Sequence, residues 1–362
     1  MDNLGATIPK KGRGAVSNES GRYEVIAREA FDDGWDHGDE SVPPLRTSVT
    51  MDRSKTIIAR NTSPDIPFDR SINPYRGCEH GCVYCFARPT HAYLGLSPGL
   101  DFESKLFAKP QAAALLEGEL RKPGYQCATL QMGSNTDPYQ PLERKLEITR
   151  QILQVLDRFN HPVGIVTKSG AVARDLDILA PMAERGLAAV AVSVTTLDRS
   201  LARKLEPRAP TPEKRLAAIR ELSAAGISVA VMAAPMIPAL NDDELERIIE
   251  AGAAAGASAA SYSLLRLPLE ISGLFEEWLD THAPLKAKHV LSLVRQCRGG
   301  RINQARFGTR FKGTGAYAQL LSKRFHLARE RAGLIDAGAS EFQLRADLFK
   351  PPPQAGDQLA LF

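Results

Sequence analysis

Cysteine is scarce in this sequence, with five residues among 362. An odd and low count argues against a framework of disulfide bonds, so we expect a protein of the reducing cytoplasm. Long apolar runs are missing as well, because none approaches the roughly 18 residues that a membrane-spanning helix needs. The first residues, MDNLGATIPKKGRG, are basic but contain no apolar segment, and we expect no secretory signal. What remains is the balance of a globular chain, with 43% hydrophobic and 24% charged residues.

Composition divides the chain into four zones. They are an N-terminal extension, a main body, a helical basic region and a proline-rich tail: residues 1–60, 61–270, 271–349 and 350–362. The extension is polar, with an acidic run from Asp32 to Glu40 that precedes a Pro-Pro pair. We expect it to pack on the main body or to be partly disordered.

The main body alternates apolar, strand-like runs with amphipathic, helix-like runs. The strand-like runs are residues 163–169, 187–197, 227–237 and 257–267, and the helix-like runs are 173–186, 211–226 and 241–256. The runs from 187 and 227 are continuously apolar, which is typical of parallel strands buried on both faces. Asn241, with Glu244 three residues later, has the pattern of a capping box for the third of these helices. About six such units, the first strand lying near residues 68–74, predict an α/β fold with fewer units than a closed eight-stranded barrel.

Polar clusters follow the predicted strands. They are MGSNTDPYQ (132–140), TKSG (167–170), SVTT (193–196) and PMIPALND (235–242). Each cluster alone could be an ordinary loop. Because ligands of parallel α/β barrels bind at the carboxyl ends of the strands, the clusters together predict a binding rim.

Three of the five cysteines fall in one loop after the first predicted strand. The stretch NPYRGCEHGCVYCFAR places Cys78, Cys82 and Cys85 in a C-x3-C-x2-C spacing. One interpretation is a zinc site completed by His80 or a distant cysteine, but no second ligand pair accompanies the motif. A second is three buried thiols without a metal. A third is a 4Fe–4S cluster held by three thiolates, with one iron open to a further ligand.

The CEHGCVYC stretch resembles the cluster loop of the radical S-adenosylmethionine superfamily, including the aromatic Tyr84 before the last cysteine. The resemblance covers roughly residues 66 to 270. It implies a partial (β/α)6 TIM-like barrel and a 4Fe–4S cluster whose open iron is chelated by S-adenosylmethionine. It also implies an external electron donor of the flavodoxin or ferredoxin type, and reductive cleavage to a 5′-deoxyadenosyl radical.

A finer resemblance points to the branch that contains spore photoproduct lyase and its DNA repair photolyase-like relatives. It is carried by GSNTDPYQPLE, TKS and PMIPALND. It implies cofactor-binding roles for Tyr84, for the cluster after the second strand, and for the ends of the third and fourth strands: Gly133, Ser134, Thr136, Asp137, Lys168 and Ser193. The second-strand cluster would hold the amino group, Lys168 the carboxylate and Ser193 the ribose. The alternatives are a solvated loop lysine at 168 and a turn residue at Asp137 before a proline.

The chain departs from the lyase in one place. Spore photoproduct lyase uses a cysteine just after the second strand as a hydrogen-atom donor, and this sequence has none there. Cys127 begins that strand, roughly 20 Å from Gly133 at about 3.3 Å per residue, and we expect it to be a small core residue. The hydrogen donor and the modified substrate therefore stay open, and no catalytic residue is assigned.

The basic region suggests a nucleic-acid partner. Residues 298–331 contain nine Lys or Arg against one Glu, with interleaved aromatics at Phe307, Phe311, Tyr317 and Phe325. Clustered cations with aromatics suit a phosphate backbone and stacked bases of DNA or RNA. The alternative is a solvated helix face with core aromatics.

The tail ends in QLALF after a proline-rich spacer. Gln358, Leu359, Leu361 and Phe362 resemble the short motif that docks bacterial repair proteins on the sliding clamp. The alternative is an apolar tail that folds back on the core. We therefore expect a lyase-like radical enzyme that acts on nucleic acid in DNA repair. The alternatives are a radical enzyme for a protein or small molecule, and a non-catalytic, metal-stabilised nucleic-acid-binding protein.

Overall fold

The computed structural model describes residues 10–25, 45–338 and 343–353. Both the acidic run from Asp32 to Glu40 and the tail motif Gln358 to Phe362 lie outside these ranges. Within them, no helix has the length and apolar character that crossing a membrane requires.

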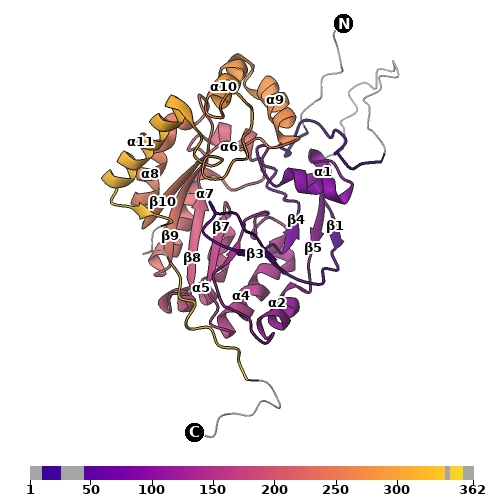
Figure 1. Ribbon diagram of the computed structural model, residues 1–362, viewed down its shortest axis with the longest axis vertical. Coiled ribbons are helices and arrows are strands. Elements are labelled where there is room, and N and C mark those ends of the chain that lie inside the picture. Colours follow the sequence, from indigo (N-terminus) through magenta and orange to yellow (C-terminus); the bar gives the residue numbers. More distant parts are fainter. Residues whose placement is uncertain (1–9, 26–44, 339–342, 354–362) are drawn as a thin grey trace.

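The main body is built on an eight-stranded sheet in the order β11-β10-β9-β8-β7-β6-β3-β2 (Figure 1). Its strands are β2 (Ile58–Arg60), β3 (Arg70–Ile72), β6 (Leu130–Met132), β7 (Val163–Thr167), β8 (Ala188–Ser193), β9 (Ser228–Met236), β10 (Ala259–Leu264) and β11 (Ile335–Asp336). The neighbours from β3 to β10 are all parallel, which confirms the predicted barrel of six units. The edge strand β11 adds a seventh parallel strand, and β2 is antiparallel.

Helices follow the strands, and several of them pack on the outside of the sheet. They are α2 (Ala112–Leu120), α3 (Glu143–Leu146), α4 (Ile148–Arg158), α5 (Leu176–Glu184), α6 (Arg199–Leu205), α7 (Pro212–Ala224) and α8 (Leu245–Ala254). Short 3-10 helices occupy Arg88–Leu94, Gly170–Asp175 and Asp242–Glu244. The continuously apolar strands β8 and β9 are buried along most of their length, because the helices cover one face and the barrel interior fills the other.

A second, three-stranded sheet lies beside the barrel in the order β1-β5-β4. It consists of β1 (Ser48–Met51), β4 (Tyr75–Arg76) and β5 (Lys105–Ala108), and helix α1 (Leu100–Ser104) leads into β5. Residues 48–51 and 58–60 of the N-terminal zone thus contribute strands to both sheets. The first cysteine follows β4 by two residues, so this small sheet supports the cysteine loop.

The C-terminal zone is helical, with α9 (Ile271–His282), α10 (Pro284–Gln296) and α11 (Gly315–Arg331). Helices α9 and α10 bury Phe275 and Trp278 in a cluster that includes Val83 and Tyr84 of the cysteine loop. Helix α11 packs beside α8 and β10 (Figure 1). This zone therefore covers the cysteine loop on one side and the edge of the barrel on the other.

Asn241 has a different role from the predicted capping box. Its side chain makes no capping hydrogen bond. It accepts from the backbone of Ile237 over 2.6 Å and donates to the carbonyls of Thr195 and Pro235 over 2.6 and 3.0 Å. The amide can make these bonds because it is fully buried between the ends of β8 and β9, where unpaired carbonyls need donors. The capping prediction was wrong, and Asn241 instead joins two strand ends at the barrel rim.

Candidate cofactor site

The three motif cysteines lie in one loop that is fixed at both ends. Cys78 donates its backbone N–H to Phe102 over 3.0 Å, and Val83 donates to Leu205 over 3.0 Å. Cys78 and Cys82 are 7% and 8% exposed, and Cys85 is partly exposed. Three thiols are therefore gathered at the carboxyl side of the barrel under a mostly buried loop.

The burial of these thiols bears on what they can bind. Burial raises the pKa of the Cys82 thiol to about 12 and that of Cys78 well above its usual range. Thiolates at such a site need adjacent positive charge, which bound iron ions supply. Among the described residues, no three His, Cys, Asp or Glu side chains are arranged to hold a metal ion together. An iron–sulfur cluster needs a different arrangement, because each thiolate binds a different iron, and three neighbouring thiols in one loop suit it.

A buried arginine stabilises the cysteine loop by hydrogen bonds to its backbone. Arg88 forms an ion pair with Glu103, and both side chains are fully buried. The same guanidinium donates to the carbonyls of Cys82 over 2.9 Å and Gly81 over 3.2 Å. Since these carbonyls belong to the loop itself, the Arg88–Glu103 pair fixes the spacing of the cysteines.

The N-terminal extension completes this support. The backbone N–H groups of Gly14 and Ala15 donate to the Glu103 carboxylate over 2.9 and 2.8 Å. A Cβ atom at Gly14 would lie 1.8 Å from the carbonyl oxygen of Gly81, so only glycine allows this approach. Residues 10–25 therefore pack on the main body, as one of the two expectations had it, and cover the cysteine loop.

Tyr84 is anchored by a carboxylate that the sequence did not single out. Its hydroxyl donates to Glu206 and lies 3.1 Å from the Thr195 hydroxyl. Glu206 is fully buried and is paired with Arg215, which is also buried. Burial alone would raise the pKa of Glu206, but the charges of Arg215 and Lys168 and the hydrogen bonds of the site lower it to about 2. The carboxylate is therefore charged at neutral pH and holds Tyr84 in place.

Lys168 and Ser193 lie together beside this network. The Lys168 ammonium is 3.2 Å from the Ser193 hydroxyl, 3.9 Å from Glu206 and 5.8 Å from the centre of the Tyr84 ring. Ser193 in turn donates to the carbonyl of Ala234 over 2.9 Å. The lysine side chain is 19% exposed, so a solvated loop lysine is a poor description of it. The structure brings together Tyr84, Lys168 and Ser193, three of the predicted cofactor-binding residues.

Asp137 is surrounded by donors from its own chain. It accepts from the Thr167 hydroxyl over 2.7 Å and from the backbone of Lys168 over 2.8 Å and of Tyr139 over 2.9 Å. His80, between two motif cysteines, lies 3.3 Å from the same carboxylate. Burial opposes the charge, but His80 and these hydrogen bonds lower the pKa of Asp137 to about 2. Asp137 therefore joins the second and third strand ends to the cysteine loop.

The remaining predicted residues form the turn that follows β6. Gly133 has φ +87°, and a Cβ there would lie 1.9 Å from the carbonyl of Val166, so glycine is required. The Thr136 hydroxyl donates to the carbonyl of Tyr75 over 3.2 Å. Ser134 is partly exposed and its hydroxyl makes no hydrogen bond with the described residues. The turn thus presents Ser134 while its neighbours fix the backbone.

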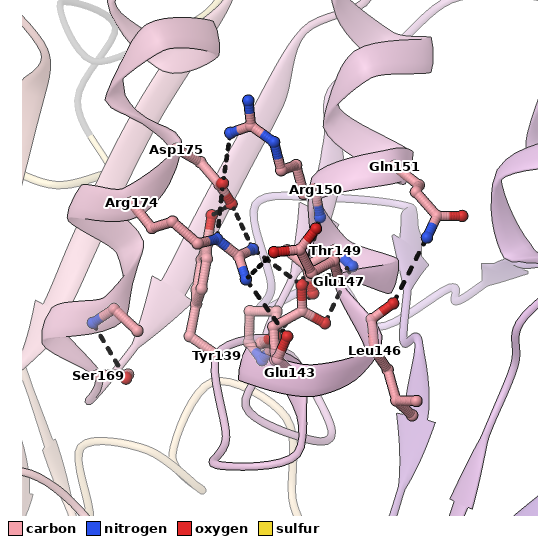
Figure 2. A network of polar contacts seen from close by, with 12 residues as sticks. Tyr139, Glu143, Leu146, Glu147, Thr149, Arg150, Gln151, Ser169, Arg174 and Asp175 are labelled. Atoms are coloured by element: carbon pink, nitrogen blue, oxygen red, sulfur yellow. Dashed lines mark hydrogen bonds and ion pairs between the residues drawn. The ribbon is translucent and has the colours of Figure 1, made fainter.

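A polar network holds the end of the same loop against the next unit of the barrel. Figure 2 shows Arg174 between Glu143 and Asp175, with Tyr139 and Arg150 on Asp175. Arg174 donates to Glu143 over 2.9 Å and to Asp175 over 2.9 Å, and the Tyr139 hydroxyl reaches Asp175 over 3.1 Å. The PYQPLE part of the motif therefore has a structural role, which keeps the rim residues in position.

The other two cysteines lie away from this loop. Cys127 precedes β6, at the opposite end of that strand from Gly133. Cys297 follows the last residue of α10 and is 2% exposed in the main hydrophobic core. Phe325 is also a core residue, 2% exposed and 4.7 Å from the ring of Tyr262, so this aromatic cannot stack on a base.

Comparisons with known proteins identify the family. The sequence profile of the radical S-adenosylmethionine superfamily matches residues 72–252. An uncharacterized protein of Mycobacterium tuberculosis is 39% identical over 233 residues, which are 64% of this chain and 68% of the relative. An uncharacterized protein of Methanocaldococcus jannaschii is 30% identical over 173 residues, 48% of this chain and 62% of the relative.

Solved structures of spore photoproduct lyase share the fold. A tyrosine-to-phenylalanine variant has a TM-score of 0.58 at 16% identity, covering 83% of this chain and 88% of that one. A complex with dinucleoside spore photoproduct has a TM-score of 0.57 at 16% identity, covering 80% of each chain. The superfamily uses an iron–sulfur cluster and S-adenosylmethionine. The chain therefore belongs to the radical S-adenosylmethionine superfamily and is an enzyme of that family.

Proposed function

We propose that Cys78, Cys82 and Cys85 hold a 4Fe–4S cluster and that the enzyme acts on nucleic acid in a repair-like reaction. The observation that carries the first part is the gathering of three thiols, two of them buried, in the loop that also places Tyr84 beside Lys168. When bound and reduced by an external flavodoxin- or ferredoxin-type donor, the cluster supplies the electron that cleaves S-adenosylmethionine to a 5′-deoxyadenosyl radical.

Each residue of the rim contacts a different part of the cofactor. Lys168 provides a positive charge for the cofactor carboxylate, and Ser193 a hydroxyl for the ribose. Gly133, Ser134 and Thr136 form the turn that meets the amino group, where Ser134 has a hydroxyl without a partner among the described residues. Asp137 contributes by position, because its oxygens already accept from the side chain of Thr167 and from backbone N–H groups.

Tyr84 and its carboxylate partner Glu206 fix the position of Lys168. The tyrosine is buried and bound to Glu206, so its ring cannot turn away from Lys168. Glu206 also lies 3.9 Å from the Lys168 ammonium and limits where that charge can point. The pairing of Glu206 with Arg215 keeps the net charge of this buried group near zero.

Two observations support nucleic acid as the substrate class. The fold is that of spore photoproduct lyase, which has been solved with dinucleoside spore photoproduct. The basic loop after α10 carries exposed cations and the exposed aromatic Phe307. The turn that directly follows β6 has no cysteine, so the hydrogen donor of the lyase has no counterpart at that position.

The test follows the hydrogen atom. The reconstituted, reduced enzyme is incubated anaerobically with S-adenosylmethionine and oligonucleotides deuterated in their bases or sugars. We expect deuterium in the 5′-deoxyadenosine from a nucleic-acid substrate and none with Cys82→Ala, which removes one thiolate. Deuterium transfer only from labelled peptide or small-molecule candidates would overturn the nucleic-acid assignment and favour the alternative substrates.

A further inference from the structure

The loop between α10 and α11 is fixed to the end of the last barrel strand. Phe311 accepts the backbone N–H of Leu264, the final residue of β10, over 2.8 Å. Arg298 is 1% exposed and donates to the carbonyls of Leu265 over 2.6 Å and Arg310 over 2.7 Å. Its guanidinium N–H groups are hydrogen-bonded to backbone carbonyls, so Arg298 positions the loop and is not free to bind a ligand.

The same loop reaches the other edge of the barrel sheet. Arg310 forms an ion pair with Asp65 over 2.6 Å, and Gly308 donates its backbone N–H to the same carboxylate over 3.0 Å. Asp65 lies in the connection between β2 and β3, whereas β10 is near the opposite end of the sheet order. The loop therefore spans the two edges that the partial barrel leaves open.

Arg266 is the exception in this region. It lies two residues after the end of β10, and its guanidinium is 4.9 Å from the centre of the Phe311 ring. The guanidinium of Arg310 lies 4.9 Å from the same ring. Arg266 makes no hydrogen bond or ion pair with any described residue, and its Nε is buried without a partner. A buried guanidinium donor without an acceptor costs on the order of 1–3 kcal/mol, which a structural role on the ring alone does not offset well.

The charges around Arg266 favour an anion. Burial and the nearby charges of Arg310 and Arg298 lower the pKa of Arg266 to about 10, so it still carries its charge at neutral pH. Asp65 is the acidic group that faces it, and Arg310 already uses that carboxylate. Phe307 is 53% exposed, with the Arg310 guanidinium 4.8 Å from its centre, and offers a ring for a base.

We propose that Arg266, beside Arg310 and the rings of Phe307 and Phe311, binds a backbone phosphate of single-stranded nucleic acid at the open side of the barrel. The guanidinium fork donates to the phosphate oxygens, and the exposed Phe307 ring stacks on an adjacent base. The proposal rests on the proposed function, because it names where the nucleic-acid substrate enters. It adds one defined phosphate contact to a loop that also carries the exposed cations Arg301, Arg306 and Lys312.

The test measures binding by the full-length, reconstituted protein. The probe is a fluorescein-labelled single-stranded DNA of about 12 nucleotides, a length within the range such sites cover, followed by anisotropy over a KCl series. Arg266→Gln should weaken binding at least about tenfold, the value of one charge-assisted hydrogen bond. It should also reduce the slope of log affinity against log salt by about 0.7, as for one lost phosphate contact. Arg331→Gln, an exposed cation at the end of α11, is the matched control and should change affinity less than twofold.

Further variants separate binding from folding and from the radical chemistry. Arg266→Lys should retain more affinity than Arg266→Gln, and both should keep the wild-type melting temperature. A second probe carries one uncharged methylphosphonate linkage at the contacted position. The wild type should bind this probe more weakly than the unmodified DNA, whereas Arg266→Gln should bind both probes equally. Cleavage of S-adenosylmethionine without substrate should be the same in Arg266→Gln as in the wild type, so a failure of the cofactor assignment would appear there and leave the binding data unaffected.

Three results would overturn the proposal. They are equal affinity of wild type and Arg266→Gln, an equal loss in Arg331→Gln, and binding of inorganic phosphate that depends on Arg266 but is not displaced by the oligonucleotide. The last result would identify a site for a free anion.

Discussion

Replacing Gly14 by alanine should detach the N-terminal segment from the cysteine loop. The added Cβ would lie 1.8 Å from the carbonyl oxygen of Gly81, and real Cβ atoms essentially never come closer than 3.0 Å to another atom. Both partners are backbone, so no side-chain rotation relieves the contact. The segment must move, and the hydrogen bonds from Gly14 and Ala15 to the buried Glu103 carboxylate are lost or lengthened.

The expected cost follows from those two bonds. Hydrogen bonds to a charged group are worth about 1.5–3 kcal/mol each, and the released segment recovers some conformational entropy. We therefore expect a loss of about 3 kcal/mol in the free energy of unfolding of the reconstituted protein, measured anaerobically in urea. Because Glu103 also orients Arg88 under the loop, visible absorbance of the cluster should decay faster in air.

The matched control is Gly118→Ala in helix α2, where an added Cβ meets nothing within 4 Å. Alanine is the better helix former, so this variant should gain about 0.5–1 kcal/mol. An unfolding free energy of Gly14→Ala within 0.5 kcal/mol of wild type, or an equal loss in Gly118→Ala, would refute the docking of the segment on the loop.

Three further predictions concern the cofactor, the core and the tail. Lys168→Ala should weaken binding of S-adenosylmethionine by about 1.5–3 kcal/mol in equilibrium dialysis, because a charge-assisted contact is lost, and unchanged affinity would remove Lys168 from the site. Burial lowers the pKa of His161 to about 4, with Tyr125 donating to its Nε2 over 2.8 Å, so the folded state keeps the ring neutral while the unfolded chain takes up a proton below about pH 6.5. The free energy of unfolding is therefore complete above that pH and should fall by up to about 3 kcal/mol towards pH 4, a loss that His161→Gln should lack. The peptide of residues 350–362 should bind a bacterial sliding clamp with micromolar affinity, which Leu361→Ala with Phe362→Ala should abolish, and absence of binding by the intact protein would end that hypothesis.

The parts of the fold that could be predicted are those that depend on a local sequence pattern, such as an apolar run or a cysteine spacing. The continuously apolar runs became β8 and β9, and the cysteine spacing marked the loop before its position was known. Glu206 could not be found in this way, because it meets Tyr84 across 122 positions of the sequence and sits in an ordinary charged helix end. The two-residue strand β11 has no apolar run and exists only because it pairs with β10.

Single residues misled where tertiary contacts replaced local ones. Asn241 has the spacing of a helix cap, but its amide instead forms hydrogen bonds with the carbonyls at the ends of β8 and β9. Phe325 was predicted as part of a binding surface because cations flank it. It lies on the buried face of helix α11 and packs in the core. Gly14 and Glu103 form a pair that no motif predicts, since their contact joins the extension to helix α1.

The most direct test of the central claim is the EPR spectrum of the anaerobically reconstituted and reduced protein, with and without S-adenosylmethionine. We expect iron and sulfide for one 4Fe–4S cluster, and a signal that changes when the cofactor binds the open iron. Cys82→Ala should hold no intact cluster, whereas Cys127→Ala, which alters a cysteine before β6, should give the wild-type spectrum. Full iron retention in Cys82→Ala, or a wild-type signal that S-adenosylmethionine leaves unchanged, would contradict it.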